Sequence, residues 1–499
     1  MATKKLSVRK SLVFSFAQKY TTLVFGFAQI VIVSRLLTPK EIGVFSVAVG
    51  LTTLANMLRT FGISDYLVQE KSLTDRMIRT SFTINLILAW VLAVIIFIAS
   101  WSVGAFFKDA GVGDVLRVMS GTFILVPFGL TTMALLRRDM AFGVLYKINT
   151  SATVASNLAT IGLAYAGFSY MSMAWASLAS MAVMVLGCAL WSSGHRVRGF
   201  SLSGWRQILP FGAKMMVSDI ATQIGQQSAN LVVGKMLGLA DAGFYSRGYG
   251  PVNMFRDKVV AAITAVAYPA FAAEHRETGT APQLFLRSLV YLTGISWPFF
   301  AFAALMALPM IRIMFGNQWD AAVPIMRWLC CAAIVGTLIY QCNQFFVAVG
   351  RIGAATVVEI QYQIARVLLA IVAALWSVEA VAASQILVYV IATALYYRKI
   401  HDFDALKVRK CVRALAPSAV VTLASSVVPA VVLFWPGFLA GHLLLGLVIA
   451  VFGASTGWLI AMVAMKHPLL EELRGAIGRG HELLIGLYRR RKPGGRTNV

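Results

Sequence analysis

About fourteen apolar stretches, each roughly twenty residues long, occupy almost the whole of this 499-residue sequence. Hydrophobic residues make up 59% of the chain and charged residues only 13%. A helix of about 20 apolar residues spans the hydrocarbon core of a bilayer and satisfies its own backbone hydrogen bonds. The sequence therefore predicts an all-α polytopic membrane protein with about 14 transmembrane helices.

The expected spans follow one another with short connections. They cover 11–33, 42–62, 80–103, 117–136, 147–167, 170–192, 209–233, 249–270, 287–308, 324–347, 356–377, 380–400, 414–434 and 440–464.

Basic residues indicate the orientation of these spans. With the N-terminus in the cytoplasm, most of the 44 Lys and Arg residues fall in or beside the cytoplasmic segments. The positive-inside rule then places both termini in the cytoplasm. Segment 466–499 has apolar residues at mostly helical spacing and ends in a basic run, which predicts an amphipathic tail bound to anionic lipid. The net charge of +24 thus needs no nucleic-acid partner.

The chain contains an internal repeat. The sequence VSRLLTPKEIGVF, residues 33–45, aligns without a gap with VGKMLGLADAGFY, residues 233–245, at an offset of 200. The matched pairs include Val33 with Val233, Arg35 with Lys235, Leu37 with Leu237, Gly43 with Gly243 and Phe45 with Tyr245. Each copy starts at the outer end of the first span of a six-span group. Arg35 and Lys235 therefore lie at outer helix ends, where a structural role is expected.

The repeat divides the chain into four parts. We expect an N-terminal six-helix lobe at 1–195, a C-terminal six-helix lobe at 205–400, two additional transmembrane helices at 411–465, and the basic cytoplasmic tail at 466–499. Repeats of this kind recur in transporters, with the substrate held between the halves.

Charged residues within the spans are the candidate site. The basic ones are Lys19, Arg59, Lys214, Arg256, Lys258 and Arg366, and the acidic ones are Asp219, Asp257 and Glu359. A charge at the bilayer centre costs roughly 3 kcal/mol or more, so such residues face protein or a water-filled cavity. A cationic cavity would hold an anionic headgroup, and a carboxylate could couple transport to an ion. Among the acids, Asp219 on a polar helix is the favoured coupling residue.

Each of these residues also has a structural alternative. Arg59 and Lys214 lie near span ends, where a long side chain can reach the interface. Asp257 could neutralise one of its basic neighbours, and Asp219 could pair with Lys214. Glu359, Gln363 and Arg366 share one helix face, which also fits a salt-bridged polar seam.

Three motifs carry a family resemblance. RLLTPKEIGVF, residues 35–45, resembles the signature R-L-L-x-P-x-E-x-G-x-[FY] of the Wzx-type polysaccharide transporters, a branch of the multidrug/oligosaccharidyl-lipid/polysaccharide (MOP) flippase superfamily. NLVVGKMLGLADAGFYSRGY, from Asn230, is similar to the second-lobe signature, with Asn where the family often has Asp. FGNQWDAAVPIMR, from Phe315, is similar to the outer loop between spans nine and ten. The fourteen spans resemble the exopolysaccharide subgroup, and the similarity covers about residues 8–400.

The resemblance implies a flippase that moves an undecaprenyl-diphosphate-linked oligosaccharide repeat unit across the bacterial plasma (inner) membrane, for exopolysaccharide or O-antigen synthesis. It implies alternating access, a cavity lined by basic residues of the first two helices of each lobe, and association with a polysaccharide polymerase and a chain-length regulator. The alternatives are a lipid II flippase and a multidrug antiporter, although spans one to six lack the acid that such antiporters use. A membrane enzyme is disfavoured by the short outer loops, and no catalytic residue, cofactor or metal site is expected.

Overall fold

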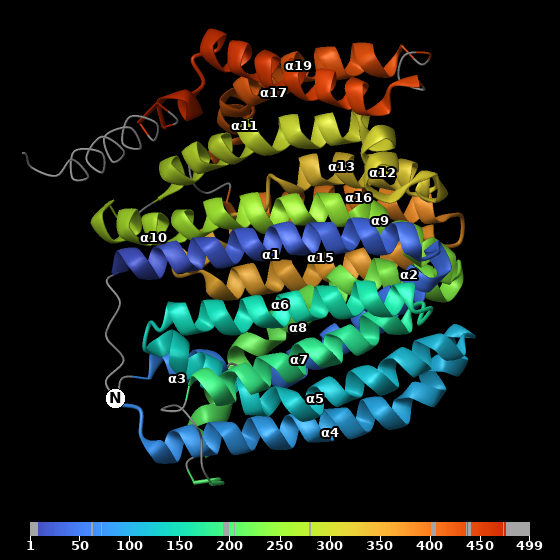
Figure 1. Cartoon of the computed structure of the whole chain (residues 1–499). Coiled ribbons are helices and arrows are strands. Elements are labelled where there is room, and N and C mark those ends of the chain that lie inside the picture. The colour runs from blue at the N-terminus through green and yellow to red at the C-terminus, as the bar shows by residue number, and fades with distance from the viewer. Residues whose placement is uncertain are drawn as a thin grey trace, which may run out of the picture. The chain divides into compact units, whose positions relative to one another are not determined.

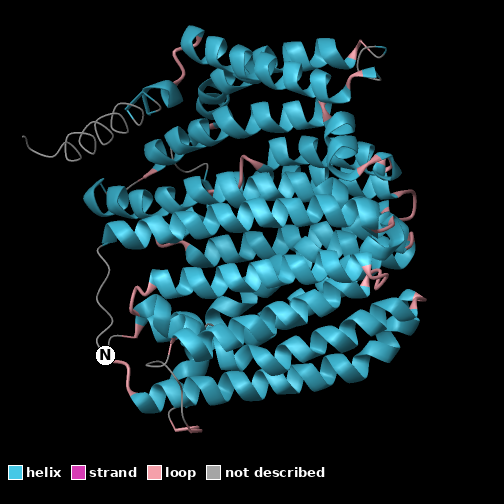
Figure 2. Ribbon diagram, viewed as in Figure 1, coloured by secondary structure: helices cyan, strands magenta, loops and turns pink. Residues whose placement is uncertain are grey.

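The protein is described by a computed structural model that covers residues 8–60, 63–70, 72–192, 199–203, 205–278, 281–400, 406–435, 437, 441–472 and 474–475. Within these ranges the side chains of residues 8–17, 19, 60, 64–65, 69 and 205–219 are not described. The described part of the chain consists of helices and loops without strands (Figure 2).

Nine described helices are long and apolar enough to cross a membrane. They correspond to Pro39–Arg59, Asp75–Phe107, Ala110–Arg138, Met171–Trp191, Pro282–Leu305, Ile352–Ala373, Val378–Ile400, Val408–Leu433 and Leu443–Ala464. Their outward surfaces carry many exposed apolar side chains, as expected for helices that face lipid rather than water. The all-α, multi-pass membrane fold predicted from the sequence is confirmed, whereas the count of fourteen spans stays a prediction.

Figure 1 shows the described helices coloured in chain order from blue to red. They fall into two compact units. The first unit comprises residues 1–250, 314–325 and 359–388. Its complete helices are α1 (Val8–Leu36), α2 (Pro39–Thr60), α3 (Ile63–Gln69), α4 (Asp75–Phe107), α5 (Ala110–Arg138), α6 (Phe142–Tyr165), α7 (Met171–Trp191) and α8 (Trp205–Met236).

The second unit comprises residues 251–313, 326–358 and 389–499. Its complete helices are α10 (Ala261–Thr278), α11 (Pro282–Leu305), α14 (Cys342–Ala348), α17 (Val408–Leu433) and α19 (Leu443–Ala464), with a π-helical turn at Arg256–Val260. Helices that have residues in both units are α9 (Leu239–Phe255), α12 (Ala307–Phe315), α13 (Ala322–Gly336), α15 (Ile352–Ala373) and α16 (Val378–Ile400). The division into two homologous lobes, an additional helix pair and a tail stays a prediction, and most of the tail lies outside the described residues.

The internal repeat is reproduced in the helix boundaries of the first unit. Helix α1 ends at Leu36 and α8 ends at Met236, while α2 begins at Pro39 and α9 begins at Leu239. Each pair of boundaries is separated by the same 200 residues that relate the two sequence copies. The short connections Leu37-Thr38 and Leu237-Gly238 therefore join equivalent helices in the two copies.

The two copies contact each other through equivalent glycines. A Cβ atom added to Gly43 would lie 1.6 Å from the carbonyl oxygen of Leu239, and one added to Gly243 would lie 1.9 Å from that of Pro39. The two contacts are equivalent in the repeat, because Gly43 corresponds to Gly243 and Pro39 corresponds to Leu239 at the offset of 200 residues. The N-terminal turns of α2 and α9 thus cross backbone against backbone, which only residues without a side chain allow.

A later segment of each repeat also contacts the last turn of the first helix of the other repeat. Gln318 and Trp319 donate side-chain hydrogen bonds of 2.8 and 2.7 Å to the carbonyl of Ser34, in the last turn of α1. Conversely, the ammonium group of Lys235, in the last turn of α8, donates a hydrogen bond to the backbone carbonyl of Phe106. The Nζ atom of Lys235 also lies 3.9 Å from the centre of the Phe106 ring. These contacts satisfy helix-end carbonyls that have no partner within their own helix.

In the second unit, the chain after α19 folds back onto α11 and α17. His467 is 1% exposed, and its Nε2 lies 3.0 Å from the hydroxyl of Ser418 on α17. Its Nδ1 accepts a hydrogen bond of 3.2 Å from the backbone N–H of Leu469, so the proton of the neutral ring is on Nε2. Gly294 of α11 leaves room for the ring, because a Cβ atom there would lie 2.8 Å from His467 Cε1.

Replacing either crossing glycine by alanine should destabilise the first unit. We expect Gly43→Ala and Gly243→Ala each to lower stability by about 1–3 kcal/mol, because the two helices must move apart to accommodate the methyl group. Thermal unfolding of the purified protein in detergent measures the effect. Gly26→Ala is the matched control, since nothing lies within 4 Å of a Cβ atom at Gly26. Equal midpoints for all three variants would contradict the close crossing.

The stability of the second unit should depend on pH through His467. Burial lowers the pKa of this imidazole below its value in the unfolded chain. The stability that the buried neutral ring contributes is therefore fully present above the unfolded pKa, and it is lost as the pH falls through the folded pKa. Glu472, five residues later in the chain, accepts hydrogen bonds from Arg287 and Tyr291 of α11. We expect the difference in thermal midpoint between wild type and His467→Gln to shrink from pH 8 to pH 5.

The exposed His442 supplies the control for this experiment. The His442→Gln variant should keep the pH dependence of the wild type. A constant difference between wild type and His467→Gln across the pH range would mean that His467 does not titrate in this window.

Candidate functional site

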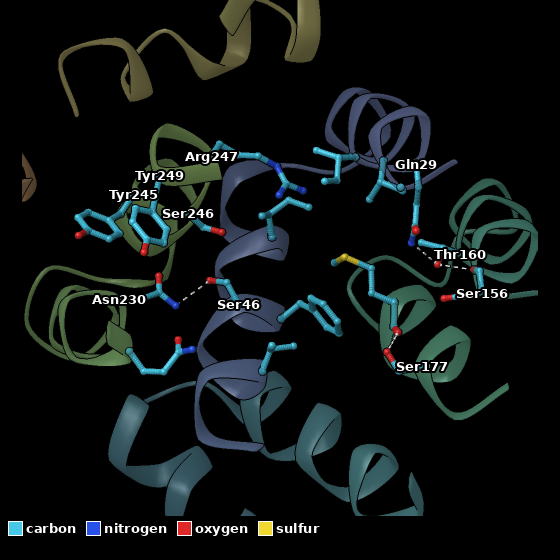
Figure 3. Close-up of a pocket in the computed structure, with 18 of the residues that line it drawn as sticks. Gln29, Ser46, Ser156, Thr160, Ser177, Asn230, Tyr245, Ser246, Arg247 and Tyr249 are labelled. Carbon is cyan, nitrogen blue, oxygen red and sulfur yellow. Dashed lines mark hydrogen bonds between the residues drawn. The ribbon is translucent and has the colours of Figure 1, made fainter. Parts of the chain in front are cut away.

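The first unit encloses a cavity of about 400 Å³ near the equivalent helix ends of the two repeats (Figure 3). Six helices line it: α1, α2, α6, α7, α8 and α9. Its volume is in the lower part of the range for small-molecule sites, about 300–1,000 Å³. The polar residues that line it are Gln29, Ser46, Ser156, Thr160, Ser177, Gln226, Gln227, Asn230, Tyr245, Ser246, Arg247 and Tyr249.

Amide and hydroxyl groups dominate the polar lining. Gln29 of α1 donates a 2.8 Å hydrogen bond to Thr160 of α6, and Asn230 of α8 donates a 3.4 Å bond to Ser46 of α2 (Figure 3). The carbonyl oxygen of the Asn230 side chain is buried and accepts no hydrogen bond from the described residues. Groups of this kind both donate and accept, as do the hydroxyls of a sugar.

Aromatic side chains cover another part of the wall. Tyr245 and Tyr249 are one helical turn apart on α9, and their rings stack at 6.2 Å between centroids. Phe45, the repeat equivalent of Tyr245, also lines the cavity. A wall with aromatic faces and convergent polar groups is typical of a site for a polar organic ligand.

Arg247 is the one charged residue in the lining of this cavity. It lies eight residues after the start of α9, roughly 12 Å along the helix. Its Nε atom is buried without a hydrogen-bond partner, and no acid of the described chain forms a salt bridge with it. Its guanidinium carbon lies 5.7 Å from the ring centres of both Phe315 and Trp319. The cavity therefore contains a positive charge that no carboxylate neutralises within the described residues.

The expected site residues lie in several places. The side chains of Lys19, Lys214 and Asp219 lie outside the described residues. Arg59 is buried, and its guanidinium donates to Asn56 at 3.4 Å and to Asn85 at 3.2 Å. Of the six predicted site residues whose side chains are described, none lines the cavity around Arg247.

Glu359 and Arg366 belong to a buried polar seam in the first unit. One oxygen of Glu359 accepts hydrogen bonds from Thr222 of α8 at 2.9 Å, from Tyr362 at 2.7 Å and from Gln363 at 2.8 Å. Arg366 in turn donates to Gln363 at 3.1 Å. The shared helix face expected for Glu359, Gln363 and Arg366 is therefore the buried face of α15, whereas their role in transport stays a prediction.

The seam depends on a glycine of α8. A Cβ atom at Gly225 would lie 1.7 Å from the side-chain oxygen of Gln363. The amide of Gln363 thus occupies the space next to the α8 backbone, between the carboxylate and the guanidinium of its own helix.

Arg256, Asp257 and Lys258 occupy the π-helical turn of the second unit. Asn253 donates to Asp257 at 3.0 Å and accepts from Arg256, which also contacts Asp257 at 3.4 Å. Lys258 is exposed. Asp257 pairs with its neighbour Arg256, as the structural alternative expected. The short π-helical segment interrupts the eighth expected span, and such interruptions are frequent at functional sites.

Sequence reasoning missed Arg247 because it placed the eighth span too late. With a span at 249–270, Arg247 belongs to an outer loop, where a basic residue needs no explanation. The structure begins α9 at Leu239, so Arg247 lies within the helix and its side chain lines the cavity. The repeat contained the necessary signal, since the expected span 42–62 shifted by 200 residues gives 242–262, a range that includes Arg247.

A larger cavity of about 630 Å³ lies in the second unit, among α11, α13, α16 and α17. Its lining is apolar apart from a few groups such as Thr393 and Arg398. A cavity of this chemistry suits hydrocarbon rather than a polar headgroup. The cavity around Arg247 is therefore the better candidate for a sugar or phosphate ligand.

The family profile described as polysaccharide biosynthesis protein matches residues 32–324, more than half of the chain. The protein belongs to this family. The matched region contains both copies of the repeat motif, nearly all of the residues that line the cavity, and the loop with Phe315 and Trp319.

Individual relatives agree with this assignment. The chain is 25% identical over 318 residues to the lipopolysaccharide biosynthesis protein WzxC of Escherichia coli, and the alignment covers 63% of each chain. It is 26% identical over 310 residues to the teichuronic acid biosynthesis protein TuaB of Bacillus subtilis, covering 60% of this chain and 62% of TuaB. It is 25% identical over 357 residues to the succinoglycan biosynthesis transport protein ExoT of Rhizobium meliloti, covering 70% of each chain. The chain thus spans less than two thirds of WzxC and TuaB.

Solved structures share the fold. The lipid II flippase MurJ in an inward closed conformation has a TM-score of 0.72 at 11% identity, over 91% of this chain and 99% of MurJ. A multidrug-resistance MATE transporter of the MOP superfamily, inward-facing, has a TM-score of 0.59 at 17% identity, over 77% of this chain and 95% of the transporter. The MOP fold expected from the sequence is confirmed. The named activities of ExoT, MurJ and the MATE protein are those of transporters and flippases, not of enzymes.

Proposed function

We propose that the protein is a flippase for an undecaprenyl-diphosphate-linked oligosaccharide repeat unit in exopolysaccharide or O-antigen synthesis. Membership of the polysaccharide biosynthesis family supports the substrate class, as do the names of WzxC, TuaB and ExoT. The fold shared with MurJ and a MATE protein supports transport by alternating access.

The observation that carries this proposal is the chemistry of the cavity around Arg247. Its amides and hydroxyls match sugar hydroxyls, its aromatic rings match the apolar faces of sugar rings, and Arg247 matches an oxyanion. The guanidinium has no acidic partner among the described residues, so a bound phosphate or carboxylate would supply its counter-charge. A small cationic drug, in contrast, would meet a like charge in this cavity.

The basic residues expected in the spans would also contribute to binding of the anionic headgroup. Lys19, Arg59, Lys214, Arg256, Lys258 and Arg366 would provide further positive charge along the path of the headgroup. Arg59 and Arg366 are buried, and their guanidinium groups donate hydrogen bonds to the amide oxygens of Asn85 and Gln363.

Energy coupling would use a carboxylate within the spans. Asp219, Asp257 and Glu359 are the candidates from the sequence, and Glu359 has the most suitable surroundings among the described side chains. It is 5% exposed and connects α8 with α15 through Thr222. A buried carboxylate whose hydrogen bonds join two helices can change its protonation or ion ligation when those helices move.

The proposed location is the bacterial plasma (inner) membrane, with both termini in the cytoplasm. The distribution of Lys and Arg supports this orientation. In it, the basic tail would bind anionic lipid, and the product would be delivered on the outer side to a polymerase and a chain-length regulator.

Lipid II transport is the alternative within the same fold. The fold shared with MurJ does not separate the two substrates, because one fold supports different ligands. The family match favours the oligosaccharide precursor, since it names polysaccharide biosynthesis.

Removing the charge of Arg247 should impair transport. We expect Arg247→Gln to reduce flipping of undecaprenyl-diphosphate-linked oligosaccharide by about 10- to 100-fold, the loss of one charge-assisted hydrogen bond of about 1.5–3 kcal/mol. Reconstituted vesicles and an external glycosidase measure how much of the oligosaccharide reaches the outer leaflet. Arg76→Gln removes an equal charge at an exposed position and should transport normally. If wild type and Arg247→Gln flip the lipid at the same rate, Arg247 is not part of the site.

Neutralising Glu359 should uncouple transport from an imposed ion gradient. Glu359→Gln keeps the size of the side chain but cannot take up or release a proton. Transport in vesicles should then proceed at one rate with and without a proton or sodium gradient, whereas the Glu70→Gln variant, altered outside the polar seam, should respond as the wild type does. A retained gradient response in Glu359→Gln would assign coupling to Asp219 or Asp257.

A further inference from the structure

The loop at residues 315–320, FGNQWD, is fixed to the end of α1. Trp319 is fully buried, and its indole N–H and the amide of Gln318 both donate to the carbonyl of Ser34. Gln318 also donates to the carbonyl of Leu37 at 3.3 Å. Gly316 has a φ of 99°, a conformation that favours glycine and turns the chain between Phe315 and Trp319. We call residues 315–320 the clamp loop.

The clamp loop presents two rings to Arg247 of α9. Phe315 is 1% exposed, its ring centre lies 6.3 Å from that of Trp319, and both rings lie 5.7 Å from the guanidinium carbon. An aromatic ring attracts a cation through its face, without accepting strong hydrogen bonds and without neutralising the charge. The rings therefore lower the cost of burying Arg247, while its N–H donors stay available in the guanidinium plane.

We propose that Trp319 is a positioning residue for anion binding: the clamp loop holds Arg247 so that its N–H groups meet an oxyanion, phosphate or carboxylate, in the cavity. The inference deepens the proposed function and rests on it for the identity of the substrate. Trp319 is not among the residues that line the cavity, so it acts through Arg247. A long side chain held in one orientation before binding loses less conformational entropy when the anion arrives.

The other repeat shows what the clamp loop adds. At the position equivalent to Arg247, the first repeat has Val47, which is fully buried. Val47 packs closely against the backbone of α8, because a Cβ atom added to Gly234 would lie 2.6 Å from its side chain. Phe106 and Phe107, in the corresponding outer segment, contact the end of α8 instead of a buried cation. The same scaffold thus gives apolar packing on one side and a positioned charge on the other.

A double-mutant cycle tests the coupling between Trp319 and Arg247. The purified full-length protein would be titrated calorimetrically with inorganic pyrophosphate and, separately, with glucuronate, which distinguishes a phosphate from a sugar carboxylate as the source of the anion. We expect Trp319→Leu to weaken binding of the preferred anion about 10-fold when residue 247 is Arg, and less than about 2-fold in the Arg247→Gln background. Trp319→Phe keeps a ring face and should stay within about 3-fold of wild type.

Trp297 provides the matched control, because its indole also donates to a backbone carbonyl, that of Ile334, within the second unit. Trp297→Leu should leave anion affinity unchanged. Equal losses from Trp319→Leu in both backgrounds would indicate a merely structural role and overturn the inference, as would binding of neither anion to the wild type. Flipping of the lipid-linked oligosaccharide is scored separately: its absence together with a retained coupling would remove the proposed function and leave the positioning role intact.

Discussion

The close approach of two helix backbones at Gly43 and Gly243 is the constraint on which the first unit depends. A carbonyl oxygen of each repeat lies where the other repeat would carry a Cβ atom. In a bilayer, where the hydrophobic effect does not drive helices together, such contacts between small residues are a main source of association. The crossing places α1, α2, α8 and α9 next to one another, and these four helices supply most of the cavity wall.

Polar groups around the cavity have consequences for the helices that carry them. Helix α6 is 24 residues long yet is not among the nine helices that are apolar enough to cross a membrane. Its polar residues include Ser156 and Thr160, which line the cavity. Helix α8 similarly carries Gln226, Gln227 and Asn230. Buried polar atoms in a membrane need partners inside the protein, so these helices pack against each other through hydrogen bonds as well as through apolar contacts.

Periodicity and repetition in the sequence predicted part of the site and left the long-range contacts open. The 200-residue offset singled out Gly43 and Gly243, and the structure gives both a steric reason that the alignment alone could not supply. The seam of Glu359, Gln363 and Arg366 was predictable from helical spacing, but its partner Thr222 on α8 is a long-range contact that spacing does not specify. Arg247 was missed because hydropathy locates the apolar centre of a span and not its polar end. Its aromatic partners Phe315 and Trp319, 68 and 72 residues later in the chain, were recognisable only as a family-like loop.

The capping of α1 by the clamp loop also affects how the protein is made. The carbonyl of Ser34 receives its hydrogen bonds from residues 284 and 285 positions later in the chain. At a synthesis rate of about 5–20 residues per second, the end of the first helix leaves the ribosome roughly 15–60 seconds before its partners exist. During that interval the helix end depends on water and lipid headgroups for its hydrogen bonds. The C-terminal end of α1 therefore acquires its final contacts late in biogenesis, after most of the first unit has been synthesised.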